Sequence, residues 1–202
     1  MTELTFIRHG QTDWNVQQRF QGQIDVPLNP TGRQQAQRLA QRLGLEPPTL
    51  LFSSDLARAQ QTAAPLASAW ATAPLLLPAL REQSFGVLEG LDAQSVQREH
   101  PGLWQQWLTQ RADFALPGGE SAAQFHTRVW AGVQALVTEH PGQRLTVVTH
   151  GGVLDMLWRS AHALPLHGLR ACEIPNVGIN RLRWVEGTLR VDVWGDAAHD
   201  GP

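Results

Sequence analysis

Two histidines stand directly after apolar runs near opposite ends of the chain. His9 follows the run 4–7 and is preceded by Arg8. His150 follows the run 145–149. An apolar run that stops at reactive residues and glycine is typical of a buried parallel strand, which delivers side chains to a site at its carboxyl end. The two histidines are therefore predicted to lie at the same edge of one sheet.

A third apolar run, at residues 49–52, leads through two serines to Arg58. Three strand ends would thus bring together two histidines and two arginines. Each would also be followed by a helix start, where free backbone N–H groups and a partial positive charge attract anions. We expect Arg8, His9, Arg58 and His150 to surround a compact dianion such as a phosphate monoester.

Phosphoryl transfer is the chemistry that these residues could perform. A neutral imidazole in a cationic site can attack phosphorus, because neighbouring cations lower its proton affinity. His9, in the tight turn, is the better candidate nucleophile, and His150 would be a further donor to the transferring group. Glu82, after a short third strand, is the candidate acid for the leaving group and could later activate water.

Each residue also has a plainer interpretation. Glu82 could be an ion-pair partner of Arg81, and Arg58 a surface residue of a helix. His9 and His150 could be metal ligands, but the sequence has no His-x-x-x-His pair or cysteine cluster beside them, and arginine next to both would repel a cation. A serine hydrolase is disfavoured because the chain lacks Gly-x-Ser-x-Gly.

Composition narrows the classes further. The chain has 202 residues, which is enough for a globular domain with a sizeable core. Its net charge of −2 gives no basic field that would attract nucleic acid or a membrane surface. It has one cysteine, Cys172, which fits a protein of the reducing cytosol. We find no signal peptide and no run long enough to span a membrane. All 16 basic residues are arginine, which excludes Schiff-base and P-loop lysine chemistry.

The remaining pattern predicts one α/β domain over residues 1–202. Thr31 is the expected N-cap of a helix at 32–43, and Ser54 that of a helix to about 70 whose first turn holds Asp55 and Arg58. Further expected elements are a strand at 75–77, a helix at 122–139, an antiparallel edge hairpin at 178–184 and 188–194, and a disordered tail at 197–202.

Residues 92–117 differ from the rest of the chain. Trp104, Trp107 and Leu108 share a helical face between prolines. We interpret this segment as a helical excursion that covers one side of the site as a lid. Arg111, together with the two tryptophans, is a candidate specificity residue there. The tryptophans fit core filling better than a ligand platform.

Taken together, these motifs resemble the histidine phosphatase superfamily, the phosphoglycerate mutase-like proteins. The resemblance rests on the ordered set Phe6-Ile7-Arg8-His9-Gly10-Gln11-Thr12-Asp13-Trp14-Asn15, Ser53-Ser54-Asp55-Leu56-Ala57-Arg58-Ala59-Gln60-Gln61-Thr62-Ala63, Glu82 with Phe85-Gly86-Val87-Leu88-Glu89-Gly90, and Thr149-His150-Gly151-Gly152. It covers nearly the whole chain. It implies a three-layer α/β sandwich with a mostly parallel central sheet, an antiparallel edge and helices on both faces.

The resemblance also implies roles. His9 would be phosphorylated, Glu82 would be the proton donor, and Arg8, Arg58 and His150 would form the phosphate pocket. Asn15, Gln21 and Gly22 fall where the family makes further phosphate contacts. No metal or nucleotide cofactor is implied. The expected partner is a small-molecule phosphate ester, without nucleic acid or membrane, in the cytoplasm, with a homodimer as the candidate assembly.

Fold and pocket leave the activity open within this family. The chain most resembles the short bacterial branch often labelled probable phosphoglycerate mutase, in which phosphatase activity is common. We expect a phosphatase, with a mutase primed by 2,3-bisphosphoglycerate, an α-ribazole phosphatase and an inactive phospho-ligand binding module as alternatives. The true mutases carry Glu-Arg-His-Tyr at the acid position, whereas this chain has Glu82-Gln83-Ser84-Phe85.

Overall fold

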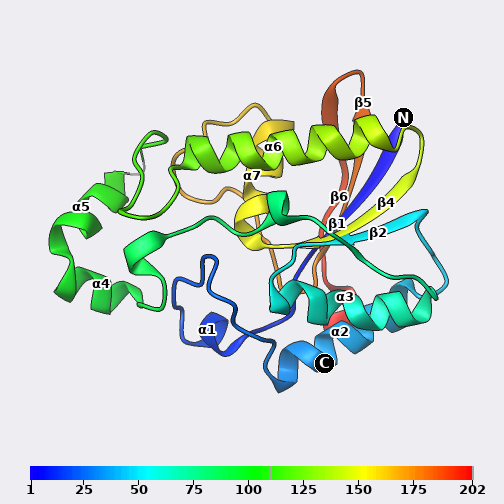
Figure 1. Cartoon of the computed structure of the whole chain (residues 1–202), viewed down its shortest axis with the longest axis horizontal. Coiled ribbons are helices and arrows are strands. Elements are labelled where there is room, and N and C mark those ends of the chain that lie inside the picture. Colours follow the sequence, from blue (N-terminus) through cyan, green and yellow to red (C-terminus); the bar gives the residue numbers. More distant parts are fainter. Residues whose placement is uncertain (110, 202) are drawn as a thin grey trace.

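A twisted sheet of six strands forms the middle layer of the protein (Figure 1). The computed structural model describes residues 1–109 and 111–201. Along the sheet the strands lie in the order β3 (Leu75–Leu76), β2 (Leu50–Ser53), β4 (Arg144–Thr149), β1 (Thr2–Arg8), β5 (Ile179–Val185) and β6 (Thr188–Asp196).

The first four strands in this order are parallel, and β5 and β6 are antiparallel at one edge. The predicted mostly parallel sheet and its edge hairpin are therefore confirmed. Glu186 and Gly187 connect β5 to β6 with φ of 50° and 82°. Two positive φ angles match the type I′ turn, whose twist suits a two-residue hairpin.

Helices cover both faces of the sheet, as the α/β prediction required (Figure 1). On one face, α6 (Ala122–Glu139) and α7 (Gly151–Ala161) pack against Leu4 and Phe6 of β1. On the other face, α2 (Pro30–Leu43) and α3 (Ala57–Ala69) pack against Ile7. Successive side chains of a strand alternate between faces, so β1 contributes to both cores.

Two helix starts differ from the sequence prediction. α2 is capped by Asn29, whose side chain accepts from the Gly32 N–H, because Pro30 occupies the first helical position and sets the required φ. The predicted cap, Thr31, lies inside the helix. α3 begins only at Ala57, and its N-cap, Leu56, makes no side-chain bond. Ser54 instead bonds a histidine of the site.

The predicted excursion contains α4 (Ala93–Glu99) and α5 (Pro101–Thr109), which stand at one end of the molecule (Figure 1). Gln110, within the predicted lid range, lies outside the described residues. A small apolar cluster holds this region together, with Leu88, Val96 and Leu116 at its centre. Leu108 was expected to share the buried face but is 51% exposed, and Leu103 packs against the cluster instead.

The chain end up to Gly201 is more ordered than the sequence suggested, and Pro202, the last residue of the predicted tail, lies outside the described residues. Short 3-10 turns form at η1 (Pro78–Leu80), η2 (Gly86–Leu88) and η3 (Ala198–Asp200). In η3, Asp200 accepts hydrogen bonds from Gln35 and Arg38 of α2, so the polar tail is tied to a helix rather than disordered. None of the helices in the described ranges has the length and apolar character needed to cross a bilayer.

Candidate active site

The carboxyl ends of β1, β2 and β4 bring the predicted site residues to one edge of the sheet. Backbone hydrogen bonding between the strands continues one residue past β1 and β2. The His9 N–H donates to the Thr149 carbonyl and the Ser54 N–H to the Val148 carbonyl, each at 2.9 Å. The imidazole rings of His9 and His150 follow, with centroids 5.3 Å apart. Residues about 140 positions apart in sequence thus become neighbours through parallel pairing.

His9 is held in one tautomer. Its ring is buried, and Nδ1 lies 2.7 Å from the Gly10 carbonyl oxygen. A carbonyl can only accept, so Nδ1 carries the hydrogen and Nε2 keeps its lone pair. Burial lowers the pKa of His9 well below its usual range, and Arg58 and Arg8 lower it further. The neutral, nucleophilic form of the ring is therefore favoured.

His150 is fully buried beside it. Nε2 lies 2.8 Å from the Ser54 hydroxyl, while Nδ1 is buried and has no partner within the described chain. Burial, followed by the charge of Arg58, lowers the pKa of His150 well below its usual range. If the Ser54 hydroxyl donates to Nε2, Nδ1 is left as an N–H donor toward a ligand.

Two arginines are anchored by their outer nitrogens. Arg8 Nη1 donates to the Ile174 carbonyl at 2.7 Å, and Arg58, fully buried, donates to the carbonyls of Gly22 and Ile24. The Nε atoms of both arginines are buried without a partner among the described residues. Burial, followed by the charge of Arg170, lowers the pKa of Arg8 to about 10. Burying a hydrogen-bond donor without a partner costs free energy, so the two Nε–H groups favour the binding of an anion that can accept from them.

Arg8, His9 and Arg58 border a cavity of about 320 Å³, which we call the phosphate cavity. His9, Arg58 and Glu82 are in its wall, and Asn15, Gln21 and Gly22 are there as well. Phe20, Phe85 and Trp14 supply apolar surface. The structure therefore places the residues predicted for the phosphate pocket in this wall, except His150, whose ring lies next to that of His9; their roles remain predictions.

A short loop and helix close one side of this cavity. α1 (Asp13–Val16) begins at a capping box in which Thr12 and Asn15 exchange hydrogen bonds. Thr12 also donates to the Gln21 side chain at 3.0 Å. Gly22 has φ +52°, and a Cβ there would lie 2.0 Å from a Glu89 carboxylate oxygen. Only glycine fits this position, which allows the Gly22 carbonyl to reach Arg58.

The Glu82 carboxylate lies against the first residues of α7, although Glu82 itself follows η1 in the chain. One carboxylate oxygen accepts from the Gly152 N–H at 3.0 Å and the other from the Gln83 N–H at 2.9 Å. A Cβ on Gly152 would lie 2.1 Å from the carboxylate, so glycine is needed for this approach. Arg81, the partner considered for Glu82, instead forms a two-point ion pair with Asp55. The Glu82 carboxylate is thereby left at the cavity wall.

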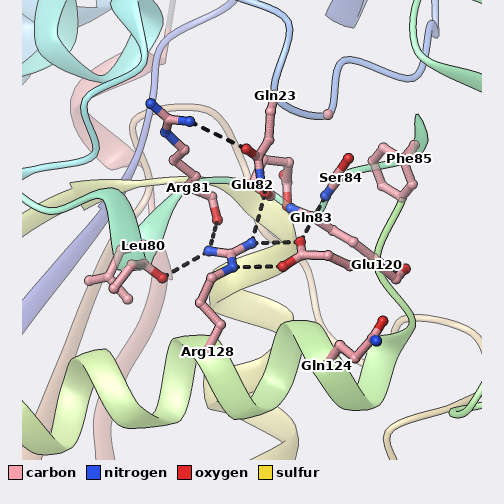
Figure 2. Close-up of polar contacts among 12 residues, drawn as sticks. Gln23, Leu80, Arg81, Glu82, Gln83, Ser84, Phe85, Glu120, Gln124 and Arg128 are labelled. Carbon is pink, nitrogen blue, oxygen red and sulfur yellow. Dashed lines mark hydrogen bonds and ion pairs between the residues drawn. The ribbon is translucent and has the colours of Figure 1, made fainter. Parts of the chain in front are cut away.

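A half-buried arginine on α6 fixes the backbone that carries Glu82 and forms the hub of a hydrogen-bond network (Figure 2). Arg128 donates to the Glu82 carbonyl at 3.1 Å and to two carbonyls just before it, those of Ala79 and Arg81. Its guanidinium also forms a two-point pair with Glu120, with both distances 2.7 Å. Glu120 in turn accepts from the Ser84 N–H. Sequence reasoning missed this hub, because Arg128 looks like any polar residue of an amphipathic helix.

The predicted lid residues separate into two groups. Trp107 and Arg111 line a second cavity of about 260 Å³ that adjoins Glu82. Trp107 also makes edge-to-face contacts with Phe20 and Phe85. Trp104 packs against the small apolar cluster under the excursion and lines neither cavity. Thus Trp107 and Arg111 lie where a ligand could reach them, and Trp104 fills a core.

Among residues 1–109 and 111–201, no cluster of three or more His, Cys, Asp or Glu side chains is arranged to hold a metal ion.

Besides Arg128, sequence reasoning overlooked Arg170, which lines both cavities. It lies in an irregular loop after α7, where neither periodicity nor a motif marks it.

Comparison with known proteins agrees with this geometry. The family model of the histidine phosphatase superfamily (branch 1) matches residues 4–197. Phosphoglycerate mutase-like protein 4 of Arabidopsis thaliana is 36% identical over 98% of this chain and 86% of its own length. A metal-independent phosphoserine phosphatase of the same plant is 34% identical over 98% of this chain and 83% of its own length.

A solved structure is similar as well. Mycobacterial glucosyl-3-phosphoglycerate phosphatase, in complex with VO3, superposes with a TM-score of 0.84 at 34% identity, over 96% of this chain and 98% of that one. Family match, relatives and fold all agree with the resemblance inferred from the motifs. The chain therefore belongs to the histidine phosphatase superfamily and is a phosphoric monoester hydrolase.

Proposed function

We propose that this protein hydrolyses small phosphate monoesters through a phosphohistidine at His9, without a metal ion. One observation carries the proposal. His9, Arg8 and Arg58 line one cavity, and His9 Nε2 makes no hydrogen bond within the described chain. The Nε atoms of both arginines, and Nδ1 of His150 next to His9, are buried there without partners among the described residues. Phosphate oxygens would satisfy these atoms while phosphorus faces the nucleophile.

In the first step, Nε2 of His9 forms a bond to phosphorus as the bond to the ester oxygen breaks. Arg8 and Arg58 stabilise the charge on the phosphoryl oxygens. The leaving oxygen takes a proton from Glu82, which acts as the general acid. In the second step, Glu82 removes a proton from water, which attacks phosphorus and releases phosphate and neutral His9.

The arrangement supports catalysis without a metal. Fixed arginine charges occupy the position that a divalent ion takes in metal-dependent phosphatases, and they would repel one at His9 and His150. A similar protein is named a metal-independent phosphoserine phosphatase, which agrees with this proposal. No organic cofactor is required, since 2,3-bisphosphoglycerate would be needed only as the primer of a mutase. We place the activity in the cytoplasm, on small soluble esters.

We further propose that hydrolysis exceeds mutase activity. A mutase must hold a second phosphoglycerate and keep water from the phosphohistidine. Gln83 and Phe85 stand where the true mutases have arginine and tyrosine, and Arg111 is already paired with Asp113. Phosphoserine and glucosyl-3-phosphoglycerate, named for two similar proteins, are the first substrates to test, with α-ribazole phosphate as an alternative.

The direct test traps the phosphoenzyme. Protein incubated with a labelled phosphate ester in EDTA and quenched should carry label that is lost in acid and survives alkali. His9→Ala should lose the label, and turnover should fall by on the order of 10⁴-fold. The control is Arg183→Gln, which removes an exposed pair on the β5–β6 hairpin and should retain both.

Three outcomes would change the proposal. Label retained in His9→Ala would move the nucleophile, with His150 the first candidate. Binding without turnover over a broad substrate panel would favour a non-catalytic binding module. Conversion of 3-phosphoglycerate to 2-phosphoglycerate, with 2,3-bisphosphoglycerate present, that ran far faster than phosphate release would indicate a mutase.

A further inference from the structure

The second cavity adjoins the phosphate cavity. It shares Glu82, Phe85 and Arg170 with the phosphate cavity, so the two meet at the carboxylate that we assign as the acid. In the proposed reaction, an ester oxygen that takes a proton from Glu82 lies at this junction, which gives the attached group access to the second cavity. The walls are mainly apolar, with the side chains of Phe85, Trp107, Phe114, Phe125, Met156 and Leu166.

Arg170 is the cation at this junction. Its side chain is 47% exposed, and its Nε lies 4.0 Å from Asp155 Oδ1, which is beyond hydrogen-bond distance. The guanidinium is close to Gly151, since a Cβ built there would lie 3.6 Å from Nη2. Within the described chain, Arg170 makes no hydrogen bond, so its donors are available to a ligand at the start of α7.

A buried arginine fixes the backbone before Arg170. Arg159 of α7 donates to the carbonyls of His167, Gly168 and Leu169 at 2.9–3.0 Å. It also pairs with Asp155 Oδ2 at 2.9 Å, within the same helix. The loop is therefore tied to α7 while the Arg170 side chain stays uncommitted. Binding a ligand would cost little rearrangement of the main chain.

The other charges around the cavity are already used. Asp155 is paired with Arg159, and Arg111 with Asp113. Glu82 accepts two backbone hydrogen bonds and serves as the acid in the proposed reaction. Arg170 has only the long contact with Asp155 Oδ1, at 4.0 Å, and that oxygen has no hydrogen-bond partner among the described residues. Arg170 is therefore the most weakly paired charge of the described wall. One arginine beside apolar walls matches a single negative charge, whereas the phosphate cavity collects two buried arginines for a dianion.

We propose that Arg170 binds a carboxylate on the leaving group, so that the preferred substrates are phosphate esters of hydroxy acids or similar carboxylated alcohols and phenols. The inference rests on the proposed hydrolase function and extends it to a substrate class. Arg170 acts in specificity here, since the phosphoryl group itself is held by Arg8 and Arg58.

The test compares phenyl phosphate with 3-carboxyphenyl phosphate, whose phenolate leaving groups have similar basicity. The wild-type protein should prefer the carboxylated ester in kcat/KM by about tenfold or more, as expected for a charge-assisted contact. Arg170→Gln should abolish the preference, mainly by raising KM for the carboxylated ester, and should change phenyl phosphate hydrolysis by less than about threefold. Arg170→Lys should keep part of the preference, and Arg183→Gln all of it.

The possible outcomes distinguish failure of the Arg170 inference from failure of the proposed hydrolase function. An equal loss of kcat/KM for both esters in Arg170→Gln would mean that Arg170 binds the phosphoryl group. An unchanged preference for the carboxylated ester would mean that Arg170 binds neither the carboxylate nor the phosphoryl group. Either result would overturn the inference while leaving a working hydrolase. Absence of turnover of both esters by the wild-type protein would instead overturn the hydrolase itself. Thermal melting of each variant checks folding, and Arg170→Lys provides the reading if Arg170→Gln is unstable.

Discussion

The two adjoining cavities are built in different ways. The phosphate cavity is lined by residues from strand ends and a helix start, and Arg58 in its wall and His150 beside His9 are fully buried. The second cavity, which we propose for the leaving group, is lined by the excursion, by the loop after α7 and by parts of α6 and α7, and its cation, Arg170, is 47% exposed. In the proposed reaction, the sheet positions the reacting groups, whereas the excursion and the loop contribute to selectivity.

Glu82 belongs to both regions and shows how they are joined. Its carboxylate is oriented by the start of α7, which is part of the sheet-based framework, through the Gly152 N–H. Its backbone is held by Arg128 of α6, which also pairs with Glu120 at the edge of the excursion (Figure 2). A disturbance on either side should therefore reach the acid, and the size of the effect should show which side contributes more.

The largest effect is expected when the acid itself is removed. Glu82→Gln keeps the shape and loses the transferable proton, so alkyl phosphates should slow by about 10²–10⁴-fold. Aryl phosphates with acidic phenols should slow much less, because their leaving groups depart without a proton. Initial rates over a series of leaving groups would measure this dependence. An equal loss across the series would remove Glu82 from the role of acid and leave it as a binding residue.

A smaller effect should follow from weakening the hub behind the acid. Glu120→Gln keeps hydrogen-bonding capacity but removes the charge that pairs with Arg128. Loosening of the Glu82 backbone should lower kcat by roughly 10- to 100-fold, since displacement of a catalytic group by about 1 Å can cost this much. The loss should depend on the leaving group as in Glu82→Gln, a pattern that destabilisation alone would not produce.

The control for this experiment is Asp113→Asn, which removes the partner of Arg111 in an exposed pair at the excursion. Exposed pairs contribute little stability, and kcat should stay within about twofold of the wild type. If Glu120→Gln lowered the melting temperature but left kcat and its leaving-group dependence intact, the hub would be structural only.

The same contrast explains what could be predicted from the sequence. The phosphate cavity was predictable because Arg8, His9 and His150 sit in short motifs after apolar runs, and parallel pairing then requires the strand ends to meet. The hydrogen-bond hubs were not predictable. Arg128 and Arg159 gain their roles from carbonyl groups that converge only in the folded chain, and each looks like an ordinary helix residue in the sequence.

Local capping explains the smaller errors. Thr31 and Ser54 both satisfy the residue preference for an N-cap, but Pro30 moves one helix start to Asn29, and His150 takes up the Ser54 hydroxyl. The polar tail was predicted as disordered from composition alone. Its Asp200 finds Gln35 and Arg38 on α2, which a composition argument cannot reveal. Long-range polar partners therefore account for most of the differences.

The smallest expected effect concerns stability and pH. His9, in the wall of the phosphate cavity, and His150 beside it are buried with pKa values well below the usual range, so they stay neutral in the folded protein. In the unfolded chain each titrates near pH 6.5, and below that pH the unfolded state binds more protons. The free energy of unfolding should therefore fall as pH decreases from about 6.5, by up to about 1.4 kcal/mol per pH unit for each histidine.

Urea unfolding of wild type and His150→Gln between pH 7 and pH 5 would isolate this contribution. The substituted glutamine cannot titrate, so the variant should lose stability less steeply over this range, whatever its stability at pH 7. His126→Gln is the matched comparison, because that histidine is only partly buried, against α7, and its pKa is lowered by burial alone. It should flatten the profile less. Equal slopes in wild type and His150→Gln would mean that His150 can take up a proton in the folded state, which would contradict the neutral histidine pair on which the phosphate cavity depends.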